Sequence, residues 1–280
     1  MHIELYKPNK TIRVVDAEGN IIEIPAPQPL VVGVPNLRVK ENYLVIDVAF
    51  LEADGIRREE FKLTRKHTLN SGKVVEEPIT ELVVFPLEAE GFDRRVLFRK
   101  PYEAGSKPVC RSDDGTYPLP EYVGTLNAAM EYVGEGGVNI ACATCPFSRW
   151  KRIEGRNVRE CDQQIQVPVA AVIDDKVLPV AVRFRSSAYK HGKRIADHVT
   201  YLNSRNVPPY NAGAELAVMS VSQMLDKPGL AGYVLAVKRI DSGLFINLDD
   251  HQKSRVIDLY NKFQSKQPET ESDAETNSDD

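Results

Sequence analysis

Residues 142–150 read Cys-Ala-Thr-Cys-Pro-Phe-Ser-Arg-Trp, with two cysteines separated by two residues. Cys161 follows after fifteen more residues, and Cys110 lies upstream; the chain holds no other cysteine. Four thiolates can complete a tetrahedral shell around zinc, and a C-x2-C turn directs both of its sulfurs toward one ion. The spacing therefore predicts one structural Zn2+ site formed by Cys110, Cys142, Cys145 and Cys161.

The same spacing is compatible with two disulfides, with ordinary buried thiols, or with a redox pair in which Cys110 and Cys161 take no part. The chain has no run of eighteen apolar residues, and residues 1–5 lack the layout of a signal peptide. A cytoplasmic protein with no membrane partner is expected on these grounds. Reducing cytosol favours metal over disulfide for the four cysteines.

The charge of the chain is unevenly distributed. The formal net charge is −4, but residues 267–280 contain six acids and no base. Without those six acids, 36 bases stand against 34 acids, so residues 1–266 carry +2. Two runs, 149–159 and 183–194, each contain five bases; the first contains one acid, Glu154, and the second none. Such local basic fields attract phosphate even on a nearly neutral protein.

The hydrophobic pattern predicts a mainly β chain. Three hairpins are expected in the first hundred residues, and together they suggest a meandering sheet that serves as scaffold. A helix is expected at 125–133, and a second β region follows the cysteines. The expected hairpins pair residues 11–15 with 21–24, 43–50 with 57–63, and 80–86 with 94–99.

In the second β region, residues 164–173 and 177–184 flank a turn at Asp174-Asp175-Lys176. Pro168 and Pro179 are expected to restrict these strands to edges, ends or bulges. A helix over 187–204, capped by Ser186 or Ser187, turns Ile195, Val199 and Leu202 inward. Strands are expected at 215–223, 232–239 and 244–247. A last helix begins at Asp249 or Asp250 and presents Val256, Leu259, Tyr260 and Phe263 at helical spacing.

Motifs for catalysis are missing from the sequence. It contains no nucleophile elbow, no His-Glu-x-x-His and no dinucleotide-binding glycine pattern. Asp174-Asp175-Lys176 resembles the acidic pair and lysine of a nuclease, but a hairpin turn is the preferred interpretation. Asp249-Asp250-His251 fits a helix N-cap better than a metal site. The protein is therefore not expected to be an enzyme.

Aromatic residues lie among the bases of both basic runs. Trp150, the only tryptophan, follows Phe147 and Arg149, while Phe184 and Tyr189 belong to the second run. Bases stack on such rings while cations follow the phosphate backbone, as single-stranded nucleic acid requires. For Phe184 the preferred interpretation is a core residue. Trp150 is alternatively a core residue, and the arginines alternatively form a solvated face without a ligand. The expected DNA contacts are Arg149, Trp150, Lys151, Arg152, Arg183, Arg185, Tyr189, Lys190, Lys193 and Arg194.

Two motifs carry a resemblance to a known group. Cys110-x-Ser-x-Asp-Gly, then Cys-x-x-Cys-Pro-Phe-Ser-x-Trp and the lone Cys161, resembles phage- and plasmid-encoded zinc-containing proteins. The later Arg183-Phe184-Arg185-Ser186-Ser187, followed by the expected helix, is similar to the same group. Some members are regarded as replication-associated single-stranded DNA-binding proteins, and the likeness covers about residues 105–240. It implies zinc and single-stranded DNA binding. Single-stranded DNA-binding proteins of several lineages also share an OB barrel and an acidic tail that recruits replication proteins. The present chain ends Ser278-Asp279-Asp280, without the terminal hydrophobic residue of the common bacterial tail.

Together these features predict an α+β, mainly β protein with an OB-like barrel, an inserted four-cysteine zinc site and an additional N-terminal β region. The expected divisions are 1–104, 105–265 and a disordered acidic tail at 266–280. The expected function is sequence-independent single-stranded DNA binding in phage or plasmid replication or recombination. The alternatives are a zinc-containing regulatory protein that contacts RNA polymerase or the replication machinery, and a metal-dependent nuclease.

Overall fold

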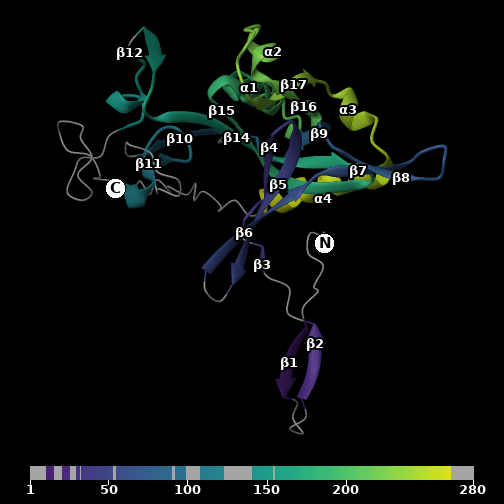
Figure 1. The fold of residues 1–280 in the computed structure, drawn as a ribbon. Coiled ribbons are helices and arrows are strands. Elements are labelled where there is room, and N and C mark those ends of the chain that lie inside the picture. Colours follow the sequence, from purple (N-terminus) through teal and green to yellow (C-terminus); the bar gives the residue numbers. More distant parts are fainter. Residues whose placement is uncertain are drawn as a thin grey trace, which may run out of the picture.

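The computed structural model describes residues 11–15, 21–25, 30–31, 33–52, 55–89, 92–98, 108–122, 141–153 and 155–265. The fold is mainly β with some helices, as the sequence predicts (Figure 1). The strands of the main sheet are β3 (Leu30–Val31), β4 (Asn36–Lys40), β5 (Tyr43–Glu52), β6 (Gly55–Lys62), β9 (Glu81–Pro86), β10 (Asp93–Phe98), β11 (Pro108–Ser112), β14 (Asp162–Ile173), β15 (Lys176–Arg185), β16 (Ala214–Ser220) and β17 (Tyr233–Ile240).

Shorter elements surround this sheet. Separate hairpins are β1 (Thr11–Val15) with β2 (Ile21–Pro25), β7 (Thr64–Thr68) with β8 (Val74–Pro78), and β12 (Lys151–Ile153) with β13 (Arg156–Val158). The α-helices are α1 (Tyr189–Asn203), α2 (Val221–Leu225), α3 (Gly243–Ile246) and α4 (Asp250–Gln264). Single 3-10 turns are η1 (Pro120–Tyr122), η2 (Pro146–Ser148), η3 (Ser186–Ala188) and η4 (Pro209–Asn211).

The long hairpin β14–β15 forms the centre of the main sheet. Its strands pair over ten positions, from Gln164 opposite Arg185 to Ile173 opposite Lys176. Asp174 adopts the left-handed conformation with φ of 53°, which aspartate tolerates in tight turns. The predicted hairpin and its Asp174-Asp175 turn are confirmed.

The two prolines of this hairpin lie in central strands, at positions where the neighbouring ladder is interrupted. The Leu87 amide donates to the Pro168 carbonyl, so the proline nitrogen faces the segment between β9 and β10, where no ladder forms. The Ala181 amide donates to the Pro35 carbonyl, at the position where β15 begins to pair with β4. The nitrogen of Pro179, two residues earlier, faces the same edge of β15 before this pairing begins. Neither strand loses a ladder hydrogen bond, because the missing donors face these gaps.

The expected hairpin between residues 80–86 and 94–99 is wrong, although both strands form. Strand β9 pairs with β14 at residues 169–172, and β10 pairs with the same strand at residues 162–165. The two strands therefore follow one another along one edge of β14. The Glu90-Gly91 turn signal is local, whereas the pairing partner lies some seventy residues further along the chain.

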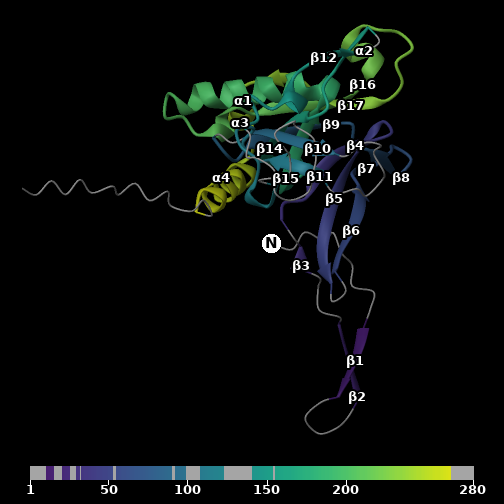
Figure 2. The same cartoon turned by 90° about the vertical axis from the view of Figure 1, so that its left-hand side faces the viewer.

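Alternate residues of the central strands face two apolar clusters. One face contributes Val84, Val169 and Val182 to the largest core cluster, where α1 adds Ile195 and Val199. The other face contributes Phe85 and its neighbours to a second cluster. The buried residues of that second cluster are Phe85, Leu87, Ala170, Val177, Leu244, Val256 and Leu259. Helices α1 and α4 thus cover opposite faces of the β14–β15 hairpin (Figures 1 and 2).

The main sheet is open in the described residues and does not form the closed barrel that the OB-like prediction implies. The strand order is β17-β16-β9-β14-β15-β4-β5-β3. The path curves enough for its first strand, β17, to contact its sixth, β4, but no backbone ladder joins these two strands. Strand β4 pairs with β15 only through Asn36 and Leu37, so its remaining residues leave a gap in the curved sheet.

Three further expectations differ from the structure. Residues 244–247 form most of the short helix α3 and not a strand. The predicted strand at 215–223 ends at Ser220, where a capping box with Gln223 begins α2. Helix α1 has Ala188 as its N-cap and no side-chain cap, because Ser186 and Ser187 belong to the preceding turn η3.

Other local predictions are confirmed. Ile195 and Val199 are buried on the inner face of α1, and helix α4 begins at an Asp249–Gln252 capping box. Strands from both sides of residue 104 share the main sheet and the largest core cluster. The helix expected at 125–133 and the tail at 266–280 lie outside the described residues. Among the described helices, none has the length and apolarity needed to cross a bilayer.

Candidate nucleic-acid interface and cysteine cluster

The face of the sheet that carries Arg183 and Arg185 is rich in arginine. Because directly paired strand residues point to the same side, the ladder registers extend this face across the sheet. We call this surface the basic face. Its charged members, together with Gln164 and Gln166, are Arg58, Glu60 and Lys62 on β6, Asp47 on β5, Arg38 and Lys40 on β4, Arg183 and Arg185 on β15, Asp162 on β14, Arg94 on β10, Arg111 on β11, and Asp113 directly after β11.

Arg183 lies at the centre of the basic face. Desolvation by surrounding groups lowers the pKa of its guanidinium, and the neighbouring charges of Arg94, Arg185, Arg111 and Arg58 lower it further. Arg183 is exposed, and the four arginines share its face of the sheet by the ladder registers. Such mutual repulsion is relieved when an anion binds among the charges.

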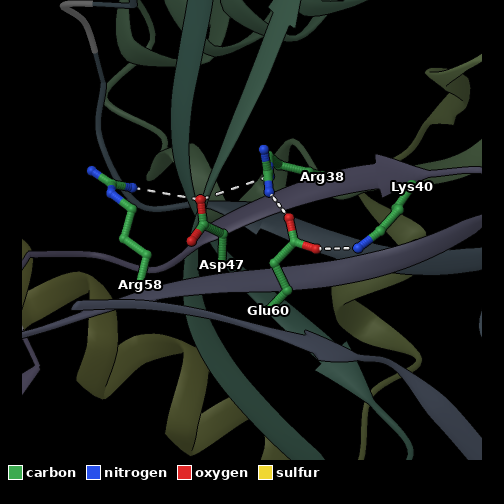
Figure 3. Close-up of polar contacts among 5 residues, drawn as sticks. All are labelled: Arg38, Lys40, Asp47, Arg58 and Glu60. Atoms are coloured by element: carbon green, nitrogen blue, oxygen red, sulfur yellow. Dashed lines mark hydrogen bonds and ion pairs between the residues drawn. The ribbon is translucent and has the colours of Figure 1, made fainter. Parts of the chain in front are cut away.

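Carboxylates neutralise one side of the basic face. Asp47 is buried and lies 3.5 Å from Arg58 Nη1 and 3.7 Å from Arg38 Nε. Glu60 pairs with Arg38 and accepts from Lys40 Nζ at 2.6 Å (Figure 3). These contacts hold the three strands β4, β5 and β6 in a fixed arrangement and place two acids among three cations.

Two acids, Asp113 and Asp162, lie at the β10–β11 end of the face, and Asp162 Oδ2 accepts from Gln164 Nε2 at 3.1 Å. Asp113 accepts from Arg111 Nε at 2.8 Å and Nη2 at 2.9 Å, and its Oδ1 lies 3.0 Å from Arg94 Nη1. In contrast, Arg183 and Arg185 form no ion pair with any carboxylate of the described residues. Arg183 donates only to the neutral amide of Gln166, at 3.2 Å. The face therefore contains eight cations and four acids, a local charge of +4, and its two β15 arginines have no carboxylate partner among the described residues.

A pocket of about 480 Å³ opens beside β15, where β4 and β17 approach each other. One wall belongs to the basic face and includes Arg38, Asp47, Arg58, Arg183 and Arg185. The rest of the lining comes from Ala188, from the β17 residues Tyr233, Val234 and Leu235, and from the β4 residues Asn36, Leu37 and Val39. The pocket thus joins a cationic wall to an apolar and aromatic one.

The ten expected DNA contacts do not lie on one surface. Arg183 and Arg185 belong to the basic face, whereas α1, with Tyr189, Lys190 and Lys193, packs on the opposite side of the sheet. Lys193 is exposed and forms a 2.7 Å ion pair with Asp197. The expected residues Arg149, Lys151 and Arg152 are exposed at and beside hairpin β12–β13. Lys151 forms a 3.1 Å ion pair with Glu160.

Arg194 has a structural contact on the α1 side. Its Nη1 donates to the carbonyl of Val237 at 3.1 Å, and the amide of Val237 donates to His191 Nδ1 at 3.1 Å. Strand β17 pairs only with β16 among the described strands, so these two side chains satisfy the outer edge of β17 at Val237.

A chain of contacts through Arg159 and Gln163 links Trp150 to Tyr189. Trp150 is 65% exposed and is therefore not a core residue, while the Arg159 guanidinium lies 4.8 Å from its ring centroid. Arg159 Nη1 donates to Gln163 Oε1 at 2.7 Å, and Gln163 Nε2 donates to the Tyr189 hydroxyl at 2.7 Å. The Tyr189 ring packs against the core, so Trp150 offers the larger free ring. Phe184, by contrast, is fully buried.

The four cysteines gather from three separate segments of the chain. The Cys142 amide donates to the Thr116 carbonyl, and the Cys161 amide donates to the Phe147 carbonyl, both at 2.8 Å. Cys110, on β11, and Phe147 pack against a small cluster that contains Cys161 and Leu97. All four thiols are free, and no disulfide links them.

The cysteines also influence each other electrostatically. Burial, then the charges of Cys161, Cys142 and Cys145, raises the pKa of Cys110 to about 12. Burial likewise raises the pKa of Cys161 to about 11. Without a metal ion these two side chains are neutral thiols at pH 7, and a metal ion would have to displace their protons.

The donor set and its surroundings fit a soft metal ion. The hydroxyl of Ser148 is buried beside Cys161 without a hydrogen-bond partner of normal geometry, and Arg95 Nε is also buried and unpartnered. The Arg95 charge favours the thiolate forms of Cys142 and Cys161. Within the part of the chain that the structure describes, no three His, Cys, Asp or Glu side chains are arranged to hold a metal ion. The zinc site therefore stays a prediction.

The sequence predicted only two of the eight cations of the basic face, Arg183 and Arg185. Arg38, Arg58 and Arg94 lie in the first hundred residues, which were expected to serve as scaffold, and Arg111 lies beside a predicted zinc ligand, in a segment that was expected to be a loop. The Arg57-Arg58 and Arg94-Arg95 pairs were a usable signal, because adjacent strand residues face opposite sides and each pair must send one arginine to each face. Only the strand order reveals that these single arginines share a surface.

Comparison with known proteins adds no relative. No protein-family model matches the chain, and no curated protein and no solved structure matches it. The site is therefore defined by its own geometry, as a curved β-sheet with an arginine-rich face, a two-sided pocket and a neighbouring cysteine cluster.

Proposed function

We propose that this protein binds single-stranded DNA without sequence preference and acts in phage or plasmid DNA replication or recombination. The observation that carries the proposal is the position of Arg183, on a sheet face that it shares with Arg58, Arg94, Arg111 and Arg185, while no carboxylate of the described residues pairs with it. Phosphate diesters are the anions that such a surface fits, because they repeat along a strand as the cations repeat across the strands. No catalytic residue forms part of this proposal.

Trp150 supports the single-stranded form of the ligand. A single strand exposes the faces of its bases, whereas a duplex hides them, and an exposed tryptophan beside cations is a stacking platform. Trp150 lies next to Arg149 and Lys151 and is covered on one side by Arg159. In the proposal this ring and the basic face contact different parts of one strand.

The proposal includes one structural zinc ion held by Cys110, Cys142, Cys145 and Cys161. Zinc would supply folding free energy to segments that otherwise share few contacts. The Ser148 hydroxyl and the Arg95 guanidinium would then stabilise the sulfur ligands as outer partners. Residues 267–280, with six acids, are proposed to contact replication proteins through basic patches on those partners.

The test is a binding series with labelled oligothymidine, the matching duplex and an RNA strand, between about 50 and 200 mM salt. We expect the tightest binding to single-stranded DNA, with an affinity that falls steeply as salt rises. Arg183→Gln should weaken binding to all sequences alike and reduce the log–log salt slope by about 0.7 for each phosphate that the variant no longer neutralises. Arg205→Gln, on the C-terminal side of α1, is the matched control and should change neither quantity.

Two outcomes would overturn the proposal. One is undetectable or salt-insensitive binding of oligothymidine by protein that is folded and retains its metal. The other is an equal decrease of affinity in Arg183→Gln and Arg205→Gln, which would show that overall charge and not the basic face carries the interaction. Co-purification with RNA polymerase in the absence of any oligonucleotide affinity would favour a regulatory protein.

A further inference from the structure

The pocket between β4 and β17 has two walls of different chemistry. Its cationic wall contains Arg183 and Arg185, which have no carboxylate partner among the described residues, and its other wall contains Tyr233 beside Val234 and Leu235. Tyr233 is 48% exposed, so a large part of its surface is free for contact. Tyr233 lies outside both basic runs, so no sequence pattern points to it.

The charge of the cationic wall determines which ligand group it can take. Asp47 is already shared by Arg38 and Arg58, so these two arginines are partly neutralised. Arg183 and Arg185 stand two residues apart on one strand face, which keeps two like charges close together. A phosphate accepts hydrogen bonds from guanidinium groups in bidentate fashion and neutralises such a pair.

The opposite wall favours an aromatic group attached to that phosphate. The Tyr233 ring offers a flat surface on which a nucleic-acid base stacks regardless of its identity. Val234 points to the other side of β17 and Leu235 is buried, so the tyrosine alone provides this surface. A volume of about 480 Å³ falls within the usual range of small-ligand pockets, about 300–1,000 Å³. A nucleotide carries both groups, a phosphate and a base, joined by one sugar.

We infer that this pocket binds one nucleotide unit, with its phosphate on Arg183 and Arg185 and its base against Tyr233. The inference rests on the proposed function and deepens it, since it assigns Tyr233 as the residue that recognises a base beside the basic face. The nucleotide is either part of a DNA strand or free in solution. Both sources offer the same chemistry, so the experiment has an arm for each.

The first arm compares two ligands of equal charge, oligothymidine and an abasic oligodeoxyribose phosphate of the same length. Tyr233→Ala should weaken oligothymidine binding roughly 5- to 150-fold, as expected when one base can no longer stack. It should leave binding of the abasic strand unchanged within about twofold, because the phosphate contacts remain. Tyr233→Phe should retain both affinities, and Tyr201→Ala, which removes an exposed tyrosine of α1, should also retain both.

The second arm uses free thymidine 5′-monophosphate and follows its binding by calorimetry. If oligothymidine binds, and Tyr233→Ala changes the affinities for oligothymidine and the abasic strand equally or not at all, the pocket inference is wrong while the proposed function stands. If no strand binds, the proposed function fails. In that case, binding of thymidine 5′-monophosphate that Tyr233→Ala and Arg183→Gln both abolish would support the pocket as a site for a free nucleotide. If thymidine 5′-monophosphate does not bind either, the pocket inference is overturned as well.

Discussion

Cys110 and Arg111 are consecutive residues of strand β11 that project from opposite faces of the sheet. Cys110 is paired with Leu97 and lies in the cysteine cluster, whereas Arg111 is paired with Val96 and lies on the basic face. One short strand therefore carries a predicted metal ligand and a cation near Arg183. Any change that displaces β11 should affect both surfaces.

The first prediction follows from this shared strand. Cys145→Ser should remove the zinc ion, lower the melting temperature and weaken binding of single-stranded DNA, because β11 loses an anchor that fixes Arg111. Elemental analysis, thermal unfolding and an oligothymidine titration measure the three effects. Thr144→Ser, in the same turn, is the control and should retain one zinc per chain. Protein purified without chelator that contains no zinc would contradict the prediction.

The second prediction concerns the pH dependence of stability through His191. Burial, then the charges of Lys190 and Arg194, lowers the pKa of His191 in the folded protein. Its Nδ1 accepts a hydrogen bond from the amide of Val237, so folding favours the neutral ring. As pH falls below the unfolded value of about 6.5, only the unfolded state takes up a proton. The unfolding free energy should then fall by up to about 1.4 kcal/mol per pH unit, until the folded pKa is reached.

Urea titrations at several pH values test this effect. His191→Gln should be less stable than the wild type at pH 7, by about 1–2 kcal/mol, because the contact with the Val237 amide is disturbed. The variant should also lack the component of pH dependence that His191 supplies. His198→Gln, on the same helix, is the control and should keep the wild-type profile; an unchanged profile in His191→Gln would exclude the proposed linkage.

The third prediction concerns Gly192, where α1 approaches the β14–β15 hairpin most closely. A Cβ atom at this position would lie 2.7 Å from Phe184 Cβ and 2.8 Å from Ile165 Cβ. Alanine is favoured over glycine in a helix by about 1 kcal/mol, but overpacking of a core costs about 1–3 kcal/mol. Both clashing atoms are attached directly to strand backbones, so we expect the clash to dominate and Gly192→Ala to be destabilised by about 2 kcal/mol.

Chemical denaturation measures the effect of Gly192→Ala directly. Lys190→Ala, an exposed position two residues earlier in the same helix, should change the unfolding free energy by less than about 0.5 kcal/mol. A Gly192→Ala variant that is more stable than the wild type would show that the helix can move away from the sheet at little cost.

The fourth prediction concerns the six acids of residues 267–280. Gln264, at the end of α4, donates through Nε2 to the Leu87 carbonyl, and the Leu87 amide contacts Pro168 on β14. Pro168 lies two residues from Gln166, which is paired with Arg183. The end of α4 is therefore close to the strand that borders the basic face. Deletion of residues 267–280 should raise the affinity for single-stranded DNA at low salt, and the gain should fade as the Debye length shortens to about 8 Å.

Truncated and full-length proteins should unfold at the same temperature, which separates competition from damage to the fold. The truncation should also abolish co-purification with replication proteins. If the two forms bind oligothymidine equally at low salt, competition by the acidic segment is excluded. A variant with the six acids replaced by their amides separates the effect of charge from that of chain length.

Local patterns predicted local structure well. The Asp-Gly signal after Ala53 and the β-branched run before it predicted the β5–β6 hairpin, and the spacing of Val256 and Leu259 predicted α4. The prediction of pairing between distant segments failed. A turn signal such as Glu90-Gly91 does not show whether its two flanking strands pair with each other or with a third strand, as β9 and β10 do with β14. The strand predicted at residues 244–247 was wrong because four apolar residues fit either a strand or one helical turn.

The candidate site was less predictable than the fold. The two basic runs identified Arg183 and Arg185 because these cations are close in sequence, whereas the zinc site expected from the cysteine spacing stays a prediction. Arg58 and Arg94 contribute to the same surface from strands more than thirty residues apart, which no local window detects. Tyr233 was missed because its importance depends on the approach of β17 to β4.

No backbone ladder joins the described strands β4 and β17, so hydrogen bonds do not fix the spacing between them. Elsewhere, a change in strand spacing would break ladder hydrogen bonds, but movement between these two described strands breaks none. A larger or smaller base could then enter the neighbouring pocket at similar free energy. Tolerance of every base would follow from the incomplete closure of the sheet and would need no base-specific contact.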